Sequence, residues 1–234
     1  MINYKHIQQG SIEWLQLKWG KIGGTLAGGL FVNSDTLLID ILSQRCEEFE
    51  PTDNYESDAM ERGSDLEHYA REYLNLYTGL EFKETGWLQS EENELLGISP
   101  DGLTEDEKIS CELKCLGRKA HYAILLKQET PKDKLDQCLH YFTVNPKLEK
   151  HYFMSFRPES PKPFIELFTL DTVIDLGQKR KVEVKQYGVK GQEIKPKIET
   201  VSDLKTIREW RKIALEKADK LLGDIKEKEK LIKF

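Results

Sequence analysis

Two carboxylates and one lysine in the middle of the chain have a spacing that could place them around a divalent cation. Residues 109–115 alternate between apolar and polar side chains, which is typical of a β-strand with Glu112 and Lys114 on one face. A symmetric hairpin before this strand would place Asp101 directly opposite Glu112, within about 5.5 Å. Two carboxylates at that distance repel each other unless one is protonated or a cation lies between them, and a hard divalent ion with oxygen ligands satisfies both.

Each of these residues also has a simpler explanation. Glu112 and Lys114 could form an exposed ion pair on an edge strand, which would add little stability. Pro100-Asp101-Gly102 is also a common turn signature. A hairpin register that places Asp101 opposite Glu112 favours the cation site over these alternatives.

A third carboxylate, Glu67, lies in a segment whose pattern predicts a helix over residues 58–77. It shares a helix face with Ala70 and Leu74. An acid on such an apolar stripe is costly unless it is paired or bound to a metal. A structural partner such as Arg71 and a metal-binding role are both open at this point.

Together these residues resemble the PD-(D/E)XK nuclease signature, in which Pro100-Asp101 is followed, after ten residues, by Glu112-Leu113-Lys114. The lambda-type phage exonucleases, also known as the alkaline exonuclease or viral recombinase family, have four such motifs in the same order. The motifs here are Arg62-Gly63-x-x-x-Glu67, Ser99-Pro100-Asp101-Gly102, Glu112-Leu113-Lys114-Cys115 and Gln137. The resemblance covers roughly residues 8–157, and four motifs in order are more specific than any one alone.

The resemblance implies a metal-dependent exonuclease that degrades one strand of linear double-stranded DNA from its 5′ end. By the family's pattern, Asp101, Glu112 and the backbone carbonyl of Leu113 hold Mg²⁺. Asp101 and Glu67 help to bind a second ion, and Mn²⁺ is an alternative metal. Two ions about 3.5–4 Å apart suit phosphodiester hydrolysis because they neutralise the phosphate oxygens and activate water.

Two further residues take roles from the same resemblance. Lys114 orients or deprotonates the attacking water and stabilises charge on the phosphate. Gln137 supports the region of the nucleophile. On a helix over residues 132–144, Gln137 shares a polar face with Lys134 and Tyr141, so this face is a plausible wall of the cleft.

The family receives the 5′-phosphate of DNA on an N-terminal segment, whose counterpart here supplies Lys18, Lys21 and Thr25. The family usually has an arginine in place of Lys18 and a serine in place of Thr25. Lysine binds phosphate as a point charge, without the planar fork of arginine. The simpler explanation of Gly23-Gly24-Thr25 is a loop followed by a helix, which would still present backbone amides to an anion.

The elements that must position these residues form a mixed order of helices and strands. Helices are predicted over 35–47, 58–77, 120–127 and 130–144, and strands over 85–90, 95–100, 109–115, 150–157 and 164–170. Thr130-Pro131 predicts a helix N-cap followed by proline at the first helical position. The order predicts an α/β (α+β) fold with a PD-(D/E)XK nuclease-like core, in which helices flank a central mixed sheet.

Two parts are expected along the chain: a lambda-exonuclease-like nuclease domain over 1–170 and an extension over 171–234. The extension ends in a Lys-rich amphipathic helix, which could contact DNA, a neighbouring subunit or a partner protein, or pack on its own subunit.

Composition excludes several classes of protein. A net charge of −6 over 234 residues argues against a protein that coats nucleic acid through a uniformly basic surface. The longest stretch without a charge, residues 22–34, is too short to cross a bilayer. The N-terminus lacks the layout of a signal peptide, so we expect the protein to be located in the cytoplasm, which is that of a bacterial host if the chain is phage-encoded.

The cysteines and histidines give no sign of a metal site. The four cysteines are most simply buried thiols, and the five histidines have no metal-binding spacing.

An acidic chain could still hold DNA inside a ring with a basic inner wall, and the resemblance implies such a ring of three subunits. It also implies a single-strand annealing protein as partner in phage-type recombination. The alternatives are a structure-specific or RecB-like nuclease on the same scaffold, or a non-catalytic DNA-binding recombination scaffold. A dead site is disfavoured because Glu67, Asp101, Glu112 and Lys114 are all present.

Overall fold

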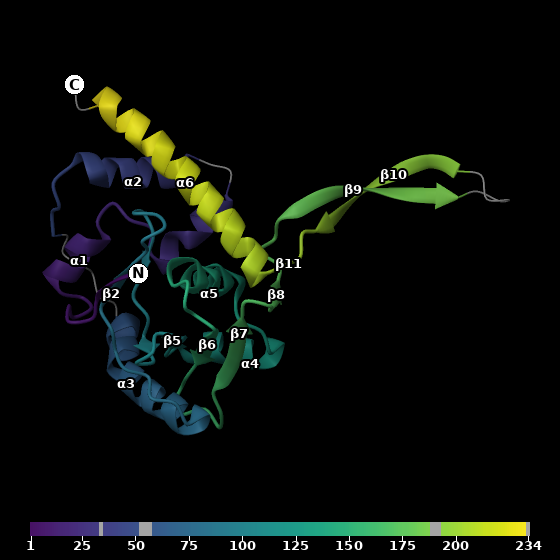
Figure 1. Ribbon diagram of the computed structural model, residues 1–234. Helices are drawn as coiled ribbons and strands as arrows, with labels where there is room; N and C mark the ends of the chain where they lie inside the picture. Colours follow the sequence, from purple (N-terminus) through teal and green to yellow (C-terminus); the bar gives the residue numbers. More distant parts are fainter. Residues whose placement is uncertain (33–34, 52–57, 188–192, 233–234) are drawn as a thin grey trace.

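The computed structural model describes residues 1–32, 35–51, 58–187 and 193–232 (Figure 1). Its helices are α1 Ile12–Lys18, the 3-10 helix η1 Gly24–Phe31, α2 Thr36–Cys46, α3 Asp58–Thr78, α4 Arg118–Lys127, α5 Lys132–Val144 and α6 Ile207–Ile232. Its strands are β1 Ile2–Tyr4, β2 Trp87–Gln89, β3 Gly97–Ile98, β4 Gly102–Leu103, β5 Ile109–Lys114, β6 Lys150–Ser155, β7 Phe164–Thr169, β8 Val173–Ile174, β9 Lys179–Tyr187, β10 Glu193–Ser202 and β11 Lys205–Thr206.

The central sheet has the strand order β4-β5-β6-β7, in which β5 and β6 are parallel and the other pairs antiparallel. The parallel pair requires a crossover, which α4 and α5 provide. On one face, Cys111 and Leu113 pack against Ala70 and Leu74 of α3, and α5 lies over the other face. The prediction of a mixed α/β fold with helices flanking a central sheet is confirmed.

The register between β4 and β5 is the one predicted from the sequence. Gly102 pairs with Cys111 and Leu103 with Ser110, so one further step along the ladder brings Asp101 opposite Glu112. The two residues that follow Asp101 belong to β4, so the hairpin loop spans residues 104–108. They extend the ladder because the backbone of Leu103 also pairs with Lys83 on its other side.

Helix α5 begins one residue later than predicted. Thr130 was expected to be its N-cap, but the N-cap is Pro131. The backbone N–H and the hydroxyl of Thr130 both donate to the Glu166 carboxylate on β7, at 2.9 and 2.6 Å. These bonds hold Thr130 against the sheet, so it is not available as a cap.

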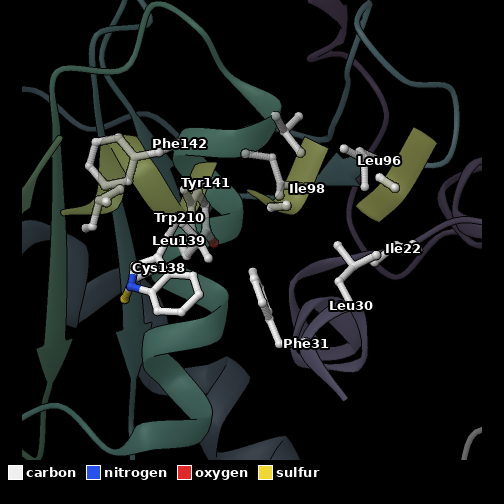
Figure 2. Packing of buried hydrophobic residues seen from close by; sticks show 14 of the residues in the cluster. Ile22, Leu30, Phe31, Leu96, Ile98, Cys138, Leu139, Tyr141, Phe142 and Trp210 are labelled. Atoms are coloured by element: carbon white, nitrogen blue, oxygen red, sulfur yellow. The ribbon is translucent and has the colours of Figure 1, made fainter. Parts of the chain in front are cut away.

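The C-terminal helix α6 is confirmed, and it packs into the main hydrophobic core together with η1, α2 and α5. Trp210, 2% exposed, lies beside Phe31 with their rings 5.5 Å apart, and Figure 2 shows it next to Cys138 and Leu139 of α5. The helix had been expected as an extension beyond residue 170. Residues of α6 share the hydrophobic core with the preceding part of the chain. The boundary between a nuclease domain and an extension at residue 170 therefore stays a prediction, which rests on where the family motifs end.

Strands β9 and β10 form a hairpin that extends away from the rest of the chain (Figure 1). The short pair β8–β11 joins its base to the start of α6. None of the helices in the described ranges is long and apolar enough to cross a membrane.

Replacing Trp210 by alanine should lower the free energy of unfolding by about 3–5 kcal/mol, because the substitution leaves a cavity where α6 meets η1 and α5. Chemical denaturation would measure this change. Leu231→Ala, at a position 76% exposed on the same helix, is the control and should change stability little. Equal effects of the two substitutions would show that α6 is peripheral to the core.

Candidate active site

Three oxygen atoms converge on the ammonium group of Lys114. Its Nζ contacts Glu112 Oε1, lies 3.9 Å from Asp101 Oδ2, and is 3.4 Å from the carbonyl oxygen of Leu113. Strand β5 supplies Glu112, Leu113 and Lys114, and the β4–β5 register brings Asp101 to them. The structure therefore brings together the four residues that the sequence analysis placed around a cation.

Both carboxylates of this group are buried, with Glu112 2% and Asp101 9% exposed. Burial, and then the neighbouring charge of Glu112, raise the pKa of Asp101 well above its usual value. The Lys114 ammonium and a 2.6 Å hydrogen bond from the Leu113 N–H to Asp101 Oδ2 only partly offset these effects. The pKa of Lys114 is raised, because the attraction of the two carboxylates exceeds the cost of its burial.

Helix α5 completes the surroundings of Glu112. The Gln137 side-chain amide donates to Glu112 Oε1 at 2.6 Å. The Tyr141 hydroxyl donates to Glu112 Oε2, and this contact was missed in the sequence analysis. Tyr141 lies four residues after Gln137, so the two side chains share one face of α5. This shared face was the signal in the sequence that could have identified the contact between Tyr141 and Glu112.

A buried histidine supports Tyr141 from the neighbouring strand. The rings of Tyr141 and His151 are stacked with centroids 4.2 Å apart, and His151 Nδ1 lies 2.9 Å from the Ser110 hydroxyl. Burial lowers the pKa of His151 to about 3, so this ring is neutral near pH 7. The neutral imidazole ring of His151 therefore packs against the Tyr141 ring and restricts its position.

Glu67 is held by a neighbour on its own helix. Its carboxylate accepts a 2.8 Å hydrogen bond from Arg71, the structural partner that the sequence left open, and its side chain is 31% exposed. Burial raises the pKa of Glu67, while the bond to Arg71 and the charge of Lys114 oppose that shift. Within the described ranges, no three His, Cys, Asp or Glu side chains form a group that could hold a metal ion.

The expected phosphate-binding residues occupy different surroundings. Lys18 Nζ lies 3.6 Å from the centre of the Trp14 ring, and burial lowers its pKa to about 8. Trp14 Nε1 donates to the Ser99 hydroxyl at 2.7 Å, which joins α1 to the segment that carries Asp101. Lys21 donates to the Glu94 carbonyl at 3.2 Å, and Thr25 is exposed in the first turn of η1.

The start of η1 is packed against the residues around Glu112. A β-carbon on Gly24 would lie 2.8 Å from Cγ of Gln137, so only glycine allows this approach. His140 Nε2 donates to the carbonyls of Ile22 and Gly97, both at 3.0 Å, and burial lowers its pKa to about 4. Helix α5 thus contacts the candidate phosphate segment and the buried carboxylates together.

The fold and this site define a class of mixed α/β proteins in which one strand presents a buried carboxylate and a lysine beside a second buried carboxylate. Residues 13–147, more than half of the chain, match the YqaJ-like viral recombinase domain, and the chain belongs to that family.

Two solved structures share the fold. The alkaline exonuclease LHK-Exo from Laribacter hongkongensis superposes with a TM-score of 0.69 at 16% identity, over 95% of this chain and 96% of that one. LHK-Exo in complex with dAMP gives a TM-score of 0.68 at 17% identity over the same shares. A comparison with curated proteins found no significant match.

Replacing Asp101 by asparagine should stabilise the chain when divalent ions are absent. A raised carboxyl pKa means that the folded chain holds the proton more tightly, so wild-type stability falls as pH rises from about 4 through the folded pKa. The Asp101→Asn chain avoids this loss, and its free energy of unfolding at pH 7.5 should exceed that of the wild type by about 1 kcal/mol or more.

Chemical denaturation at pH 4 and pH 7.5 would measure the difference, which should shrink at the lower pH. Asp106→Asn in the same hairpin is the control, because hydrogen bonds from Thr104 and Lys108 lower the pKa of that exposed carboxyl. A loss of stability in Asp101→Asn at pH 7.5 would contradict the interpretation.

Proposed function

We propose that this chain is a metal-dependent nuclease that hydrolyses DNA. The observation that carries the proposal is the convergence of Asp101, Glu112 and the Leu113 carbonyl on one cation, the Lys114 ammonium. Membership of the viral recombinase family and the fold shared with an alkaline exonuclease support it.

The donor set fits a hard divalent cation. Two carboxylates and a backbone carbonyl are the oxygen ligands that Mg²⁺ accepts. Burial and the neighbouring charge of Glu112 raise the pKa of Asp101, and a divalent cation between the two carboxylates would favour their charged forms. Asp101, Glu112 and the Leu113 carbonyl would hold Mg²⁺, or Mn²⁺ in its place. Glu67 would help to position a second ion together with Asp101, once its carboxylate is released from Arg71.

The protein's own residues have separate tasks in this proposal. Lys114, which is cationic because its pKa is raised, orients the attacking water and stabilises charge on the phosphate. Gln137 and Tyr141 fix the orientation of the Glu112 carboxylate. Bound divalent ions would supply Lewis-acid activation of the water and neutralise the phosphate oxygens.

We further propose that the chain digests linear double-stranded DNA 5′→3′ and leaves 3′ single strands for an annealing protein. Lys18, Lys21 and Thr25 would receive the 5′-phosphate, since Gly24 lies against Gln137 and Trp14 joins Lys18 to Ser99. A trimeric ring in the cytoplasm of a bacterial host completes the proposal, because such a ring could present basic residues of this acidic chain to DNA.

A digestion time course with Mg²⁺ tests the proposal. The substrates are linear duplex with a 5′-phosphate, the same duplex with a 5′-hydroxyl, and closed circular DNA. Linear DNA should lose one strand from its 5′ ends while the circle survives. Cleavage of the circle would favour a structure-specific or RecB-like nuclease, and no cleavage with Mg²⁺ or Mn²⁺ would favour a non-catalytic DNA-binding scaffold.

Glu112→Gln should reduce the cleavage rate by at least about 10²-fold, because it removes a negative charge from the proposed ion site. Mn²⁺ binding, followed by electron paramagnetic resonance, should weaken in parallel. Glu149→Gln, at an exposed carboxylate paired with Lys108, is the matched control and should retain both properties. Wild-type cleavage by Glu112→Gln would exclude the site.

The preference for a 5′-phosphate should fall as pH rises from 7 to 9. A lysine whose pKa is about 8 loses its charge over this range, and a neutral amine no longer attracts the phosphate. The measured quantity is the ratio of initial rates on the two linear duplexes. In Lys18→Arg, which stays charged, the ratio should not change with pH. A ratio that falls equally in both chains would show that Lys18 is not the residue responsible.

A further inference from the structure

The hairpin of β9 and β10 stands apart from the core of the molecule, and we call the segment 179–202 that forms it the β9–β10 arm (Figure 1). Its strands have 9 and 10 residues and pair with each other in a sheet of their own. No described residue of the arm belongs to either hydrophobic cluster. A two-stranded hairpin has little stability by itself in water, so the position of the arm fits contact with a partner better than support of the core.

The arm is basic although the chain as a whole is acidic. Residues 179–202 contain seven lysines and arginines against three acids, a net charge of +4, so the remaining residues carry −10. Charge of one sign on a projecting element attracts a ligand of the opposite sign and speeds its association. An acidic body repels a polyanion, so the charge of the arm makes it the element that is suited to hold one.

At the base of the arm, one face presents two lysines beside two hydroxyl groups. Lys179 pairs with Ser202 and Lys181 pairs with Thr200 in the antiparallel ladder. Residues that lie directly opposite each other in such a ladder share one face of the sheet, and all four of these residues are exposed. Lysine ammonium groups and the hydroxyls of serine and threonine are common donors to the phosphate oxygens of DNA, which they contact without reading the sequence.

The length of the arm matches one turn of double-stranded DNA. The 10 residues of β10 span about 33 Å at about 3.3 Å per residue, and one turn of B-DNA rises about 34–36 Å. A two-stranded ribbon is also narrow enough for the major groove, which is about 12 Å wide. The arm can therefore follow a duplex over a full helical turn.

We propose that the β9–β10 arm binds the phosphate backbone of double-stranded DNA, away from the end at which a strand is cleaved. The inference rests on the proposed nuclease function and adds to it a contact outside the candidate active site. Because this contact is electrostatic, it does not depend on sequence and weakens steeply with salt. It keeps the duplex attached while the strand end at Asp101 and Glu112 is renewed after each cleavage.

Fluorescence anisotropy tests the inference, with a duplex of about three helical turns in EDTA, so that no strand is cut. Lys179→Gln/Lys181→Gln should weaken binding at least about tenfold and reduce the slope of log affinity against log salt by about 2, because each lost phosphate contact removes about 0.9. Lys179→Arg/Lys181→Arg keeps both charges, so its affinity should stay within about twofold of the wild type.

Lys228→Gln/Lys230→Gln is the matched control. It removes the same charge at two exposed positions near the far end of α6, about 30 Å from the start of that helix, where the arm is attached (Figure 1). Affinity and salt slope should both match the wild type.

Unchanged affinity and salt slope in Lys179→Gln/Lys181→Gln would overturn the inference. If sedimentation then showed a smaller assembly for that variant, the arm would bind a second copy of the chain and not DNA. Thermal melting would check that the variant is folded. The single substitution Lys181→Gln would take its place if it is not, with an expected change in slope of about 1.

The DNA digestion assay separates the two proposals. If the wild-type chain binds the duplex, Lys179→Gln/Lys181→Gln loses that binding and neither chain cuts DNA, the arm stands and the nuclease proposal fails. If DNA is cut normally and affinity and salt slope are the same in all chains, the nuclease proposal stands and the role of the arm is excluded.

Discussion

The burial of the Glu112 carboxylate is the constraint on which the rest of the structure depends. This group lies in the middle of a central strand and is 2% exposed, where an uncompensated charge would cost several kcal/mol. Lys114 compensates it from the same strand, and Gln137 and Tyr141 do so from α5. Helix α5 must therefore cross this face of the sheet, and η1 and α6 then pack against α5.

The sequence predicts the parts of the site that depend on short-range periodicity. Alternation over residues 109–115 and the hairpin symmetry are enough to place Asp101 opposite Glu112, because strand register follows from counting residues. The contact of Tyr141 depends on how α5 is rotated over the sheet, which long-range packing determines. The packing of α6 into the core could not be predicted from the sequence either. An amphipathic pattern shows that one face of a helix is apolar, but it does not specify which surface covers that face.

Two ionisable residues, Asp101 and Lys18, lie in surroundings that disfavour their charged forms. Asp101 is buried beside another carboxylate, and Lys18 is partly desolvated over the Trp14 ring. Burial disfavours the charged form of both side chains. Such surroundings are expected where a site must attract a ligand of the opposite charge, because a group already neutralised by its neighbours has little attraction left for a ligand.

The position of α5 between the buried carboxylates and the segment around Gly24 has an evolutionary consequence. Gln137 touches Gly24 and Glu112 at once, and His140 joins Ile22 to Gly97. A substitution at either helix position disturbs two distant parts of the chain together. In divergent relatives these residues should therefore covary with the glycine segment and with strand β5 as one inherited unit, while the surfaces around them vary independently.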